Sequence, residues 1–358
     1  MKAAVCYEFG KDLLIEDVKL DSPRANEVKV TLKACAICHS DIHYAEGAWG
    51  GVLPAVYGHE AAGVISEVGS AVKGLKVGDH VVVSLIRFCG CCYYCNQGHL
   101  PLCESEFPSA ERLQDRDGKT IYQGLRTGAF AEEVVVDRSQ VVVMPKSMPF
   151  DSASLLACGV ITGLGAVTHT AKVPFGSSVV VIGAGGVGLN SLQGARLMGA
   201  EPIIALDVVP EKLETAKKFG ATYAFNAKDE GLKEKIHSLT QGRGADFVFV
   251  TVGSVRAMEQ GLELLRRAGS LVMVGMPASG AKMTFEAVDF ADAAKHIMGS
   301  KMGSIRPHIE IPKLIELYLA EKRLKLDELI SNRYPLDQIS KAIHEVKQGQ
   351  VLRNVILF

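Results

Sequence analysis

The first 150 residues carry short apolar runs in which hydrophobic and polar positions mostly alternate. These runs fall at residues 27–32, 61–68, 80–85 and 130–136, and glycines interrupt the chain between them at positions 50, 51, 69, 74 and 78. Alternation with a period of two is typical of half-buried strands, and frequent glycines mark turns. The pattern therefore predicts a barrel-like or sandwich-like β domain.

The periodicity changes near Ser177. Apolar runs at residues 179–182, 202–206, 247–250 and 271–274 then alternate with helical stretches, one through Leu197 and one from Pro210 to Phe219. Strands that alternate with helices in this way predict a parallel, doubly wound sheet. From about residue 303 the pattern predicts amphipathic helices at 312–321 and 336–346 and a final strand at 351–358.

The chain has 358 residues, of which 48% are apolar and 22% charged, and its formal net charge is −1. This length suggests about two domains with real cores, and the charge balance indicates no nucleic-acid partner. The amino terminus lacks an apolar signal segment, and no apolar run reaches the ~18 residues of a membrane span. The sequence therefore favours a cytoplasmic protein with no membrane partner.

Four of the nine cysteines, Cys89, Cys92, Cys95 and Cys103, follow a C-x2-C-x2-C-x7-C spacing. In a reducing cytosol such clustering indicates a metal before it indicates disulfides. Four thiolates close the tetrahedral shell of zinc, so a site of this kind is structural. The alternatives are free thiols, an iron–sulfur cluster, and a register that uses Cys91, which is otherwise the spare cysteine.

A glycine-rich turn follows the apolar run at 179–182. It reads Gly183-Ala184-Gly185-Gly186-Val187-Gly188 and precedes a helical stretch, which is the context that the G-x-G-x-x-G dinucleotide fingerprint requires. In that motif the pyrophosphate lies on the amino terminus of the helix. The alternative is an ordinary strand-to-helix turn.

Asp207 ends the next predicted strand, 24 residues after Gly183. An acid at this place holds the ribose hydroxyls of NAD and would repel the 2′-phosphate of NADP. No arginine or lysine follows before Lys212. The sequence therefore favours NAD over NADP, and a helix cap is the alternative role of Asp207.

Three separate pieces contain further metal-binding side chains. They are Cys38-His39-Ser40-Asp41-Ile42-His43, Gly58-His59-Glu60 and Cys158-Gly159. Each is weak by itself, because a lone histidine or cysteine usually packs in a core. Cys35 and Cys38 could also form a redox pair, although the pattern around them is not that of a thioredoxin βαβ unit.

Together with the four-cysteine segment and the glycine motif, in this order, these pieces resemble the zinc-containing medium-chain alcohol dehydrogenases. The resemblance covers essentially the whole chain, to the closing Leu352-Arg353-Asn354-Val355-Ile356. It implies an α/β protein with a GroES-like β-rich catalytic domain at residues 1–159, whose structural zinc lobe lies at about 87–105. A Rossmann NAD-binding domain at 160–302 follows, and residues 303–358 return to the catalytic domain. The resemblance also implies an active site in the cleft between the domains and a homo-oligomer, either a dimer or a tetramer.

In this family the catalytic zinc ligands correspond to Cys38, His59 and Cys158, with a fourth position left for water or substrate. Asp41 would hold the ligand histidine in the correct tautomer, and Glu60 would be a carboxylate just outside the ligands. Ser40 would touch the substrate oxygen, and His43 would pass its proton to solvent.

The resemblance also implies contacts with the dinucleotide. His39 and Arg353 would contact its pyrophosphate, Lys212 its adenosine ribose, and the backbone of Val274 its nicotinamide amide. The alternative for His39 and Lys212 is an ordinary surface position.

The implied reaction is hydride transfer between NAD(H) and an alcohol and its aldehyde or ketone, with two zinc ions per chain. Zinc stabilises an alkoxide for the same reason that it lowers the pKa of bound water to about 7. The alternatives are a glutathione-linked formaldehyde or polyol dehydrogenase of the same superfamily, a zinc-free reductase, and a non-enzymatic NAD-binding protein. Trp49 would line the substrate pocket or pack in the core, and the segment between Cys103 and Phe130 would form a solvated loop.

Overall fold

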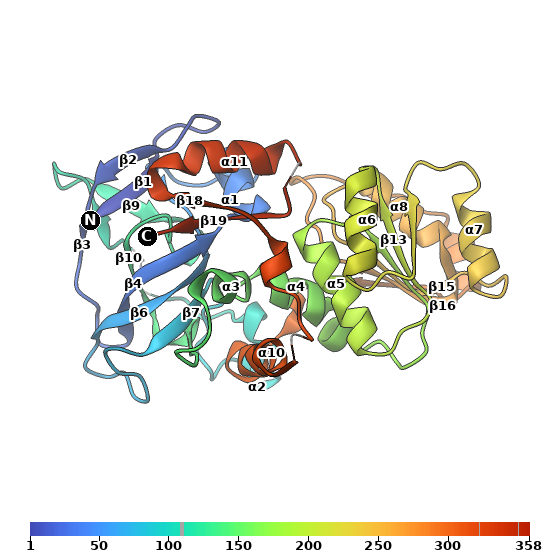
Figure 1. The fold of residues 1–358 in the computed structure, drawn as a ribbon, viewed down its shortest axis with the longest axis horizontal. Coiled ribbons are helices and arrows are strands. Elements are labelled where there is room, and N and C mark those ends of the chain that lie inside the picture. The colour runs from blue at the N-terminus through green and yellow to red at the C-terminus, as the bar shows by residue number, and fades with distance from the viewer. Residues whose placement is uncertain (108–110, 322, 350) are drawn as a thin grey trace. The chain divides into compact units, whose positions relative to one another are not determined.

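The computed structural model describes residues 1–107, 111–321, 323–349 and 351–358. The chain forms two compact units (Figure 1). The first contains Met1–Gly159 and Arg306–Phe358, and the second contains Val160–Ile305. The second boundary therefore lies at 305/306, three residues after the expected 302/303.

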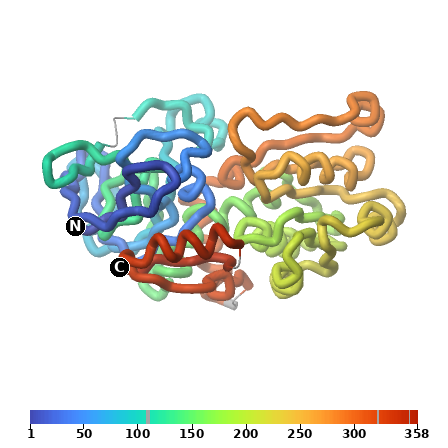
Figure 2. The backbone as a smooth tube through the Cα atoms, turned by 90° about the horizontal axis from the view of Figure 1, so that it is seen from above, coloured from blue at the N-terminus to red at the C-terminus, as the bar shows by residue number. Residues whose placement is uncertain are grey.

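Seven strands form the larger sheet of the first unit, in the order β11-β7-β6-β4-β19-β18, with β10 also paired to β4. They are β4 (Glu27–Ala36), β6 (Glu60–Val68), β7 (His80–Ser84), β10 (Glu133–Asp137), β11 (Val141–Val143), β18 (Ile330–Pro335) and β19 (Arg353–Leu357). Alternate side chains of β4, those of Val28, Val30 and Leu32, are buried as the period of two predicts. Because β19 pairs antiparallel with β4, the carboxyl-terminal segment lies beside the amino-terminal strands (Figure 2).

A smaller sheet in the same unit has the order β2-β1-β5-β9-β8-β3. Its strands are β1 (Lys2–Cys6), β2 (Leu14–Asp17), β3 (Lys19–Leu20), β5 (Ala55–Val56), β8 (Leu113–Gln114) and β9 (Thr120–Gln123). The β8–β9 hairpin occupies part of the segment between Cys103 and Phe130 that was expected to be a solvated loop. Residues 108–110 of that segment lie outside the described residues.

Arg112, just before β8, also departs from the solvated-loop expectation. It is buried, and its Nη2 donates to both carboxylate oxygens of Glu27 at 2.6 and 2.7 Å. A guanidinium is buried at low cost only beside a partner charge. Its partner stands 85 residues earlier in the chain, so local composition could not indicate the burial.

The longer helices of the first unit are α1 (His39–Ala45), α3 (Phe150–Leu155), α10 (Pro307–Glu321) and α11 (Ile339–Lys347). α10 begins five residues before the expected start at Pro312, which lies inside the helix. Pro307 marks the start because a proline in the first turn lacks only an N–H that would have no helical partner. The helix expected at 336–346 begins as a 3-10 turn, Leu336–Gln338, and continues as α11. No helix in the described ranges has both the length and the apolar character needed to cross a membrane.

The second unit contains one parallel sheet of six strands in the order β14-β13-β12-β15-β16-β17. Its strands are β12 (Val179–Ile182), β13 (Ile203–Asp207), β14 (Tyr223–Asn226), β15 (Ala245–Val250), β16 (Leu265–Met273) and β17 (His296–Gly299). Its helices are α4 (Gly159–Gly165), which begins at the unit boundary, α5 (Gly186–Leu197), α6 (Pro210–Lys218), α7 (Leu232–Leu239), α8 (Val255–Glu263) and α9 (Ala287–Asp292). The strand order reverses between β12 and β15, and such a switch point is where doubly wound sheets bind ligands. The expected α/β class with a parallel, doubly wound sheet is confirmed.

Candidate functional site

Cys38 lies at the turn from β4 into α1. Its backbone is extended (φ −108°, ψ 152°) and it caps the amino terminus of α1. Its N–H donates to Oδ2 of Asp41 at 3.1 Å, which closes the first turn of the helix. The sequence Cys-x-x-Asp thereby holds the thiol and a carboxylate at one end of a helix.

His59 enters the same place from the start of β6. Gly58 before it adopts φ +92°, and a Cβ there would lie 2.6 Å from the backbone nitrogen of Phe130. Only glycine fits such a position without strain. The Gly58 N–H donates to Oδ1 of Asp41 at 2.9 Å, so the turn is tied to α1.

The buried side chains of His59 and Asp41 form a hydrogen bond of 2.8 Å between Nδ1 and Oδ1. Because an ionised carboxylate only accepts, Nδ1 carries the proton and Nε2 presents a lone pair. Nε2 is buried without a hydrogen-bond partner among the described residues. A buried acceptor of this kind costs free energy unless another group, such as a metal, occupies it.

Cys158 completes the cluster from the segment after α3. One ligand atom from each of Cys38, His59, Glu60 and Cys158 lies within 4.8 Å of the others. A hydrogen bond from Cys158, together with His59, holds the pKa of Cys38 well below its usual value, while the same hydrogen bond and burial raise the pKa of Cys158. Two sulfurs and an imidazole nitrogen are a donor set that suits zinc. Cys35, by contrast, is buried on β4, and its pKa is raised by burial.

Glu60 is the charged neighbour of this cluster. Its Oε2 pairs with Nη2 of Arg353 on β19, and its Oε1 has no hydrogen-bond partner within the described chain. Burial raises the pKa of Glu60 to about 7, although the charge of Arg353 opposes the shift. Gly159 leaves room for the guanidinium, since a Cβ there would lie 2.2 Å from Arg353 Nη1. The predicted role of Arg353 at the pyrophosphate stays a prediction, and the pair with Glu60 is a contact that sequence reasoning missed.

The four-cysteine segment folds into a second cluster. The Sγ atoms of Cys89, Cys92, Cys95 and Cys103 lie within 4.8 Å of one another, with Cys89 to Cys95 at 4.0 Å and Cys92 to Cys103 at 3.9 Å. Four thiolates at zinc–sulfur bonds of about 2.3 Å would stand about 3.8 Å apart. The sulfurs therefore fit one tetrahedral ion, whereas a multi-iron cluster would spread them further.

Backbone N–H groups point into this second cluster. Those of Cys91 and Cys92 donate to Sγ of Cys89 at 3.4 and 3.2 Å. A hydrogen bond from Ser105, and then that from Cys91, lower the pKa of Cys89 to about 5, which favours the thiolate. The Cys91 side chain is exposed, 3.6 Å from Cys89, and lies outside the set of four.

The glycine motif lies between β12 and α5 of the second unit. Gly183 has φ +99°, and a Cβ on Gly188 would lie 1.7 Å from the Gly183 carbonyl oxygen. A Cβ on Gly185, which caps α5, would meet no atom within 4 Å. The first and last glycines thus permit the turn and its close packing, and open space lies beside the amino terminus of α5, where anions bind. Gly186 and Val187 form the first turn of this helix.

Asp207 is buried at the end of β13. Its Oδ2 accepts from the N–H of Ala184 at 2.7 Å and its Oδ1 from that of Val209 at 3.0 Å. The carboxylate is thereby fixed beside the glycine turn. It is not the cap of α6, because that position belongs to Val209.

The remaining predicted residues occupy both units. His39, Ser40 and His43 lie on α1 of the first unit, and Lys212 on α6 and Val274 after β16 in the second. His39 is exposed and Lys212 half-buried, so both are accessible. Half-buried Trp49 packs its ring 4.9 Å from that of His43.

Comparison with known proteins places the chain in a family. The alcohol dehydrogenase GroES-like domain family matches residues 24–146, and the zinc-binding dehydrogenase family matches residues 186–320. The chain is 36% identical to an NDMA-dependent alcohol dehydrogenase of Amycolatopsis methanolica, over 99% of this chain and 98% of that protein. It is 35% identical to an S-(hydroxymethyl)glutathione dehydrogenase of Saccharomyces cerevisiae, over 99% and 95%. The crystal structure of benzyl alcohol dehydrogenase from Acinetobacter calcoaceticus has a TM-score of 0.93 at 33% identity and matches 100% of this chain and 99% of that one.

Replacement of Asp41 by asparagine should weaken zinc binding at the Cys38–His59–Cys158 cluster. The amide cannot accept the Nδ1 proton of His59 with a carboxylate's strength, and losses of about 10- to 100-fold are typical for such partners. Competition with a chromogenic zinc chelator measures the change. Glu46→Gln at the other end of α1 is the control, and equal affinities in both variants would contradict the role of Asp41.

Replacement of Cys103 by serine should remove one zinc per chain and lower the unfolding temperature, because structural zinc contributes directly to folding. Cys91→Ser should keep the full zinc content and stability. Elemental analysis and thermal unfolding measure both effects. If Cys91→Ser lost the metal while Cys103→Ser kept it, the register that uses Cys91 would be the correct one.

Proposed function

Because the chain belongs to the zinc-containing medium-chain alcohol dehydrogenases, we propose that it transfers a hydride between NAD(H) and an alcohol and its carbonyl product at a zinc ion bound by Cys38, His59 and Cys158. One observation carries this assignment. His59 has a ring nitrogen within 4.8 Å of two cysteine sulfurs, and its Nε2 is buried without a hydrogen-bond partner among the described residues, in a tautomer held by Asp41. A second zinc would occupy the four-cysteine cluster.

Zinc, when bound, supplies Lewis acidity to the substrate oxygen. The chain's own groups prepare the place for it. The lowered pKa of Cys38 favours a thiolate, which is the form that binds metal. The carboxylate of Glu60 also lies in the cluster and is paired with Arg353 through Oε2. The proposal takes Cys38, His59 and Cys158 as the three ligands, which leaves a fourth position for substrate.

The alcohol proton would leave by way of two side chains on α1. Ser40 and His43 are both half-buried on this helix, which begins at the ligand Cys38. A hydroxyl both accepts and donates, and an imidazole exchanges protons near neutral pH, so the two can pass a proton in sequence. The ring of Trp49 packs on His43 and restricts its orientation.

The cofactor assignment to NAD is supported by Asp207. Its carboxylate is fixed by two backbone N–H groups beside the glycine turn, so it cannot easily move away from a 2′-phosphate. Because the Asp207 carboxylate is buried and fixed, it would repel that phosphate more strongly than a mobile carboxylate on the surface.

Oxidation of a glutathione–formaldehyde adduct is the second candidate reaction. It is favoured by the 35% identity with the yeast S-(hydroxymethyl)glutathione dehydrogenase. A panel of primary, secondary, aromatic and polyol substrates, with formaldehyde plus glutathione as one member, separates the two when NADH absorbance is followed.

Replacement of Cys38 by alanine should lower turnover on the best substrate by about a thousandfold, because a zinc-bound substrate oxygen contributes several kcal/mol to the barrier reduction. Dinucleotide binding and the zinc of the four-cysteine cluster should be retained. Cys35→Ala, a buried cysteine three residues away, is the matched control and should keep its activity. Retained turnover in Cys38→Ala would refute the catalytic assignment.

Replacement of Asp207 by serine should shift the ratio of kcat/KM for NADP over NAD upward by about tenfold or more, because the repulsion of the 2′-phosphate is removed. Steady-state kinetics with each cofactor measures the ratio. Glu214→Ser on the exposed face of α6 should leave the ratio unchanged. A wild-type enzyme that already prefers NADP would show the cofactor assignment to be wrong.

A further inference from the structure

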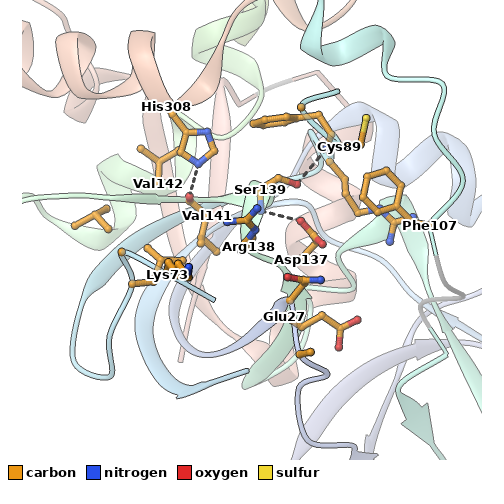
Figure 3. A pocket seen from close by; sticks show the side chains of 18 of the residues that line it. Glu27, Lys73, Cys89, Phe107, Asp137, Arg138, Ser139, Val141, Val142 and His308 are labelled. Carbon is orange, nitrogen blue, oxygen red and sulfur yellow. Dashed lines mark hydrogen bonds between the residues drawn. The ribbon is translucent and has the colours of Figure 1, made fainter. Parts of the chain in front are cut away.

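The first unit contains a pocket of about 830 Å³ that the proposed chemistry does not use (Figure 3). Its wall comes from β11, the segments 24–27, 73–75, 87–90 and 137–139, and the start of α10. A volume of this size suits a small organic ligand.

Positive charge in this pocket exceeds what its acids can balance. Arg87, Lys73 and Arg138 line it, and none of the three forms an ion pair or a side-chain hydrogen bond with another described residue. The two acids of the lining already have partners. Glu27 accepts two hydrogen bonds from Arg112, and Asp137 accepts from the N–H of Ser139 at 2.8 Å.

Arg87 is the most constrained of the three cations. Its guanidinium carbon stacks 4.1 Å from the centre of the Phe107 ring. Its Nε is buried and has no hydrogen-bond partner in the described part of the chain. A buried guanidinium donor without an acceptor is costly unless an anion binds to it.

The lining of the pocket is also partly apolar. Leu75, Val142 and Phe88 line it. The Phe88 ring packs edge-to-face on His308 at 5.5 Å. Figure 3 shows His308, whose Nε2 donates to the carbonyl oxygen of Val141 at 3.0 Å. These contacts hold an aromatic surface beside the cationic one.

We propose that this pocket binds an oxyanion, either a carboxylate or a phosphate monoester, carried on an aromatic or aliphatic body. The planar guanidinium of Arg87 would bind the oxyanion through its fork of donors, with Lys73 and Arg138 adding charge. The body would pack against Leu75, Val142 and Phe88. Cys89 of the four-cysteine cluster borders the pocket, but Cys38, His59, Cys158 and the glycine turn are not among its lining residues, so the site is distinct from the proposed substrate and dinucleotide sites.

The test is calorimetric titration of the full-length zinc-loaded protein with phenyl phosphate and, separately, with benzoate. At least one probe should bind, and Arg87→Gln should weaken that binding by about tenfold or more, as expected for loss of a charge-assisted pair. Arg116→Gln, an exposed arginine outside the pocket, is the matched control and should bind within about twofold of wild type. Binding of only one probe identifies the source of the oxyanion as phosphate or carboxylate.

The difference in affinity between wild type and Arg87→Gln reports on this pocket alone, because the variant leaves the glycine turn, another possible phosphate site, intact. If Arg87→Gln proves unstable, Lys73→Gln, an exposed position, should weaken binding by about threefold and Arg87→Lys should weaken it through loss of the fork. Absence of heat with both probes at about 10 mM, which corresponds to a dissociation constant weaker than the millimolar range, would overturn the proposal. Equal affinities in wild type and in Arg87→Gln would overturn it as well.

Discussion

The carboxylate of Asp41 is the point on which the candidate metal site depends. One oxygen accepts from the N–H of Gly58 and from Nδ1 of His59, and the other accepts from the N–H of Cys38. These three donors belong to the amino terminus of α1 and to the turn before β6, so one buried side chain joins two segments that each carry a proposed ligand. Hydrogen bonds to an ionised group contribute about 1.5–3 kcal/mol each, which makes this carboxylate a strong local constraint.

Backbone space is the second constraint. Gly58 lets His59 approach beneath Phe130, Gly159 admits the guanidinium of Arg353 beside Glu60, and Gly188 packs against the carbonyl of Gly183. In each case a Cβ would lie within 2.6 Å of a neighbouring atom. The functional side chains of the candidate sites are therefore positioned in part by glycines, which have no side chain of their own.

The two cysteine-containing clusters differ in how they are assembled and in how many ligands they would give a metal ion. The four-cysteine cluster is closed by residues within a span of 15 positions and by backbone N–H groups of the same loop, so it forms locally and leaves no ligand position open. The Cys38–His59–Cys158 cluster draws its ligands from two strand ends and the segment after α3, over 120 residues. An oxygen of Glu60 also lies within this cluster, but the carboxylate forms an ion pair with Arg353 through Oε2. With Cys38, His59 and Cys158 as the proposed ligands, this cluster would keep one ligand position open for exchange, whereas the four cysteines would close theirs.

What the sequence by itself determined are the features written in short windows. The strand, glycine turn and helix from β12 to α5, the acid at the end of β13, the spacing of the four cysteines and the alternation along β4 all depend on neighbours a few residues apart, and the α/β class follows from them. The proposed ligands Cys38, His59 and Cys158 follow from the resemblance to a family, since no short window of the sequence contains them together. Only the tertiary structure decided the ion pairs of Glu60 with Arg353, 293 residues apart, and of Glu27 with Arg112, and the stacking of Arg87 on Phe107. The reason is physical. Whether a charge is buried, and which charge balances it, depends on segments that come together only when the sheets have formed. Because these segments are distant in the sequence, local composition cannot indicate the contacts.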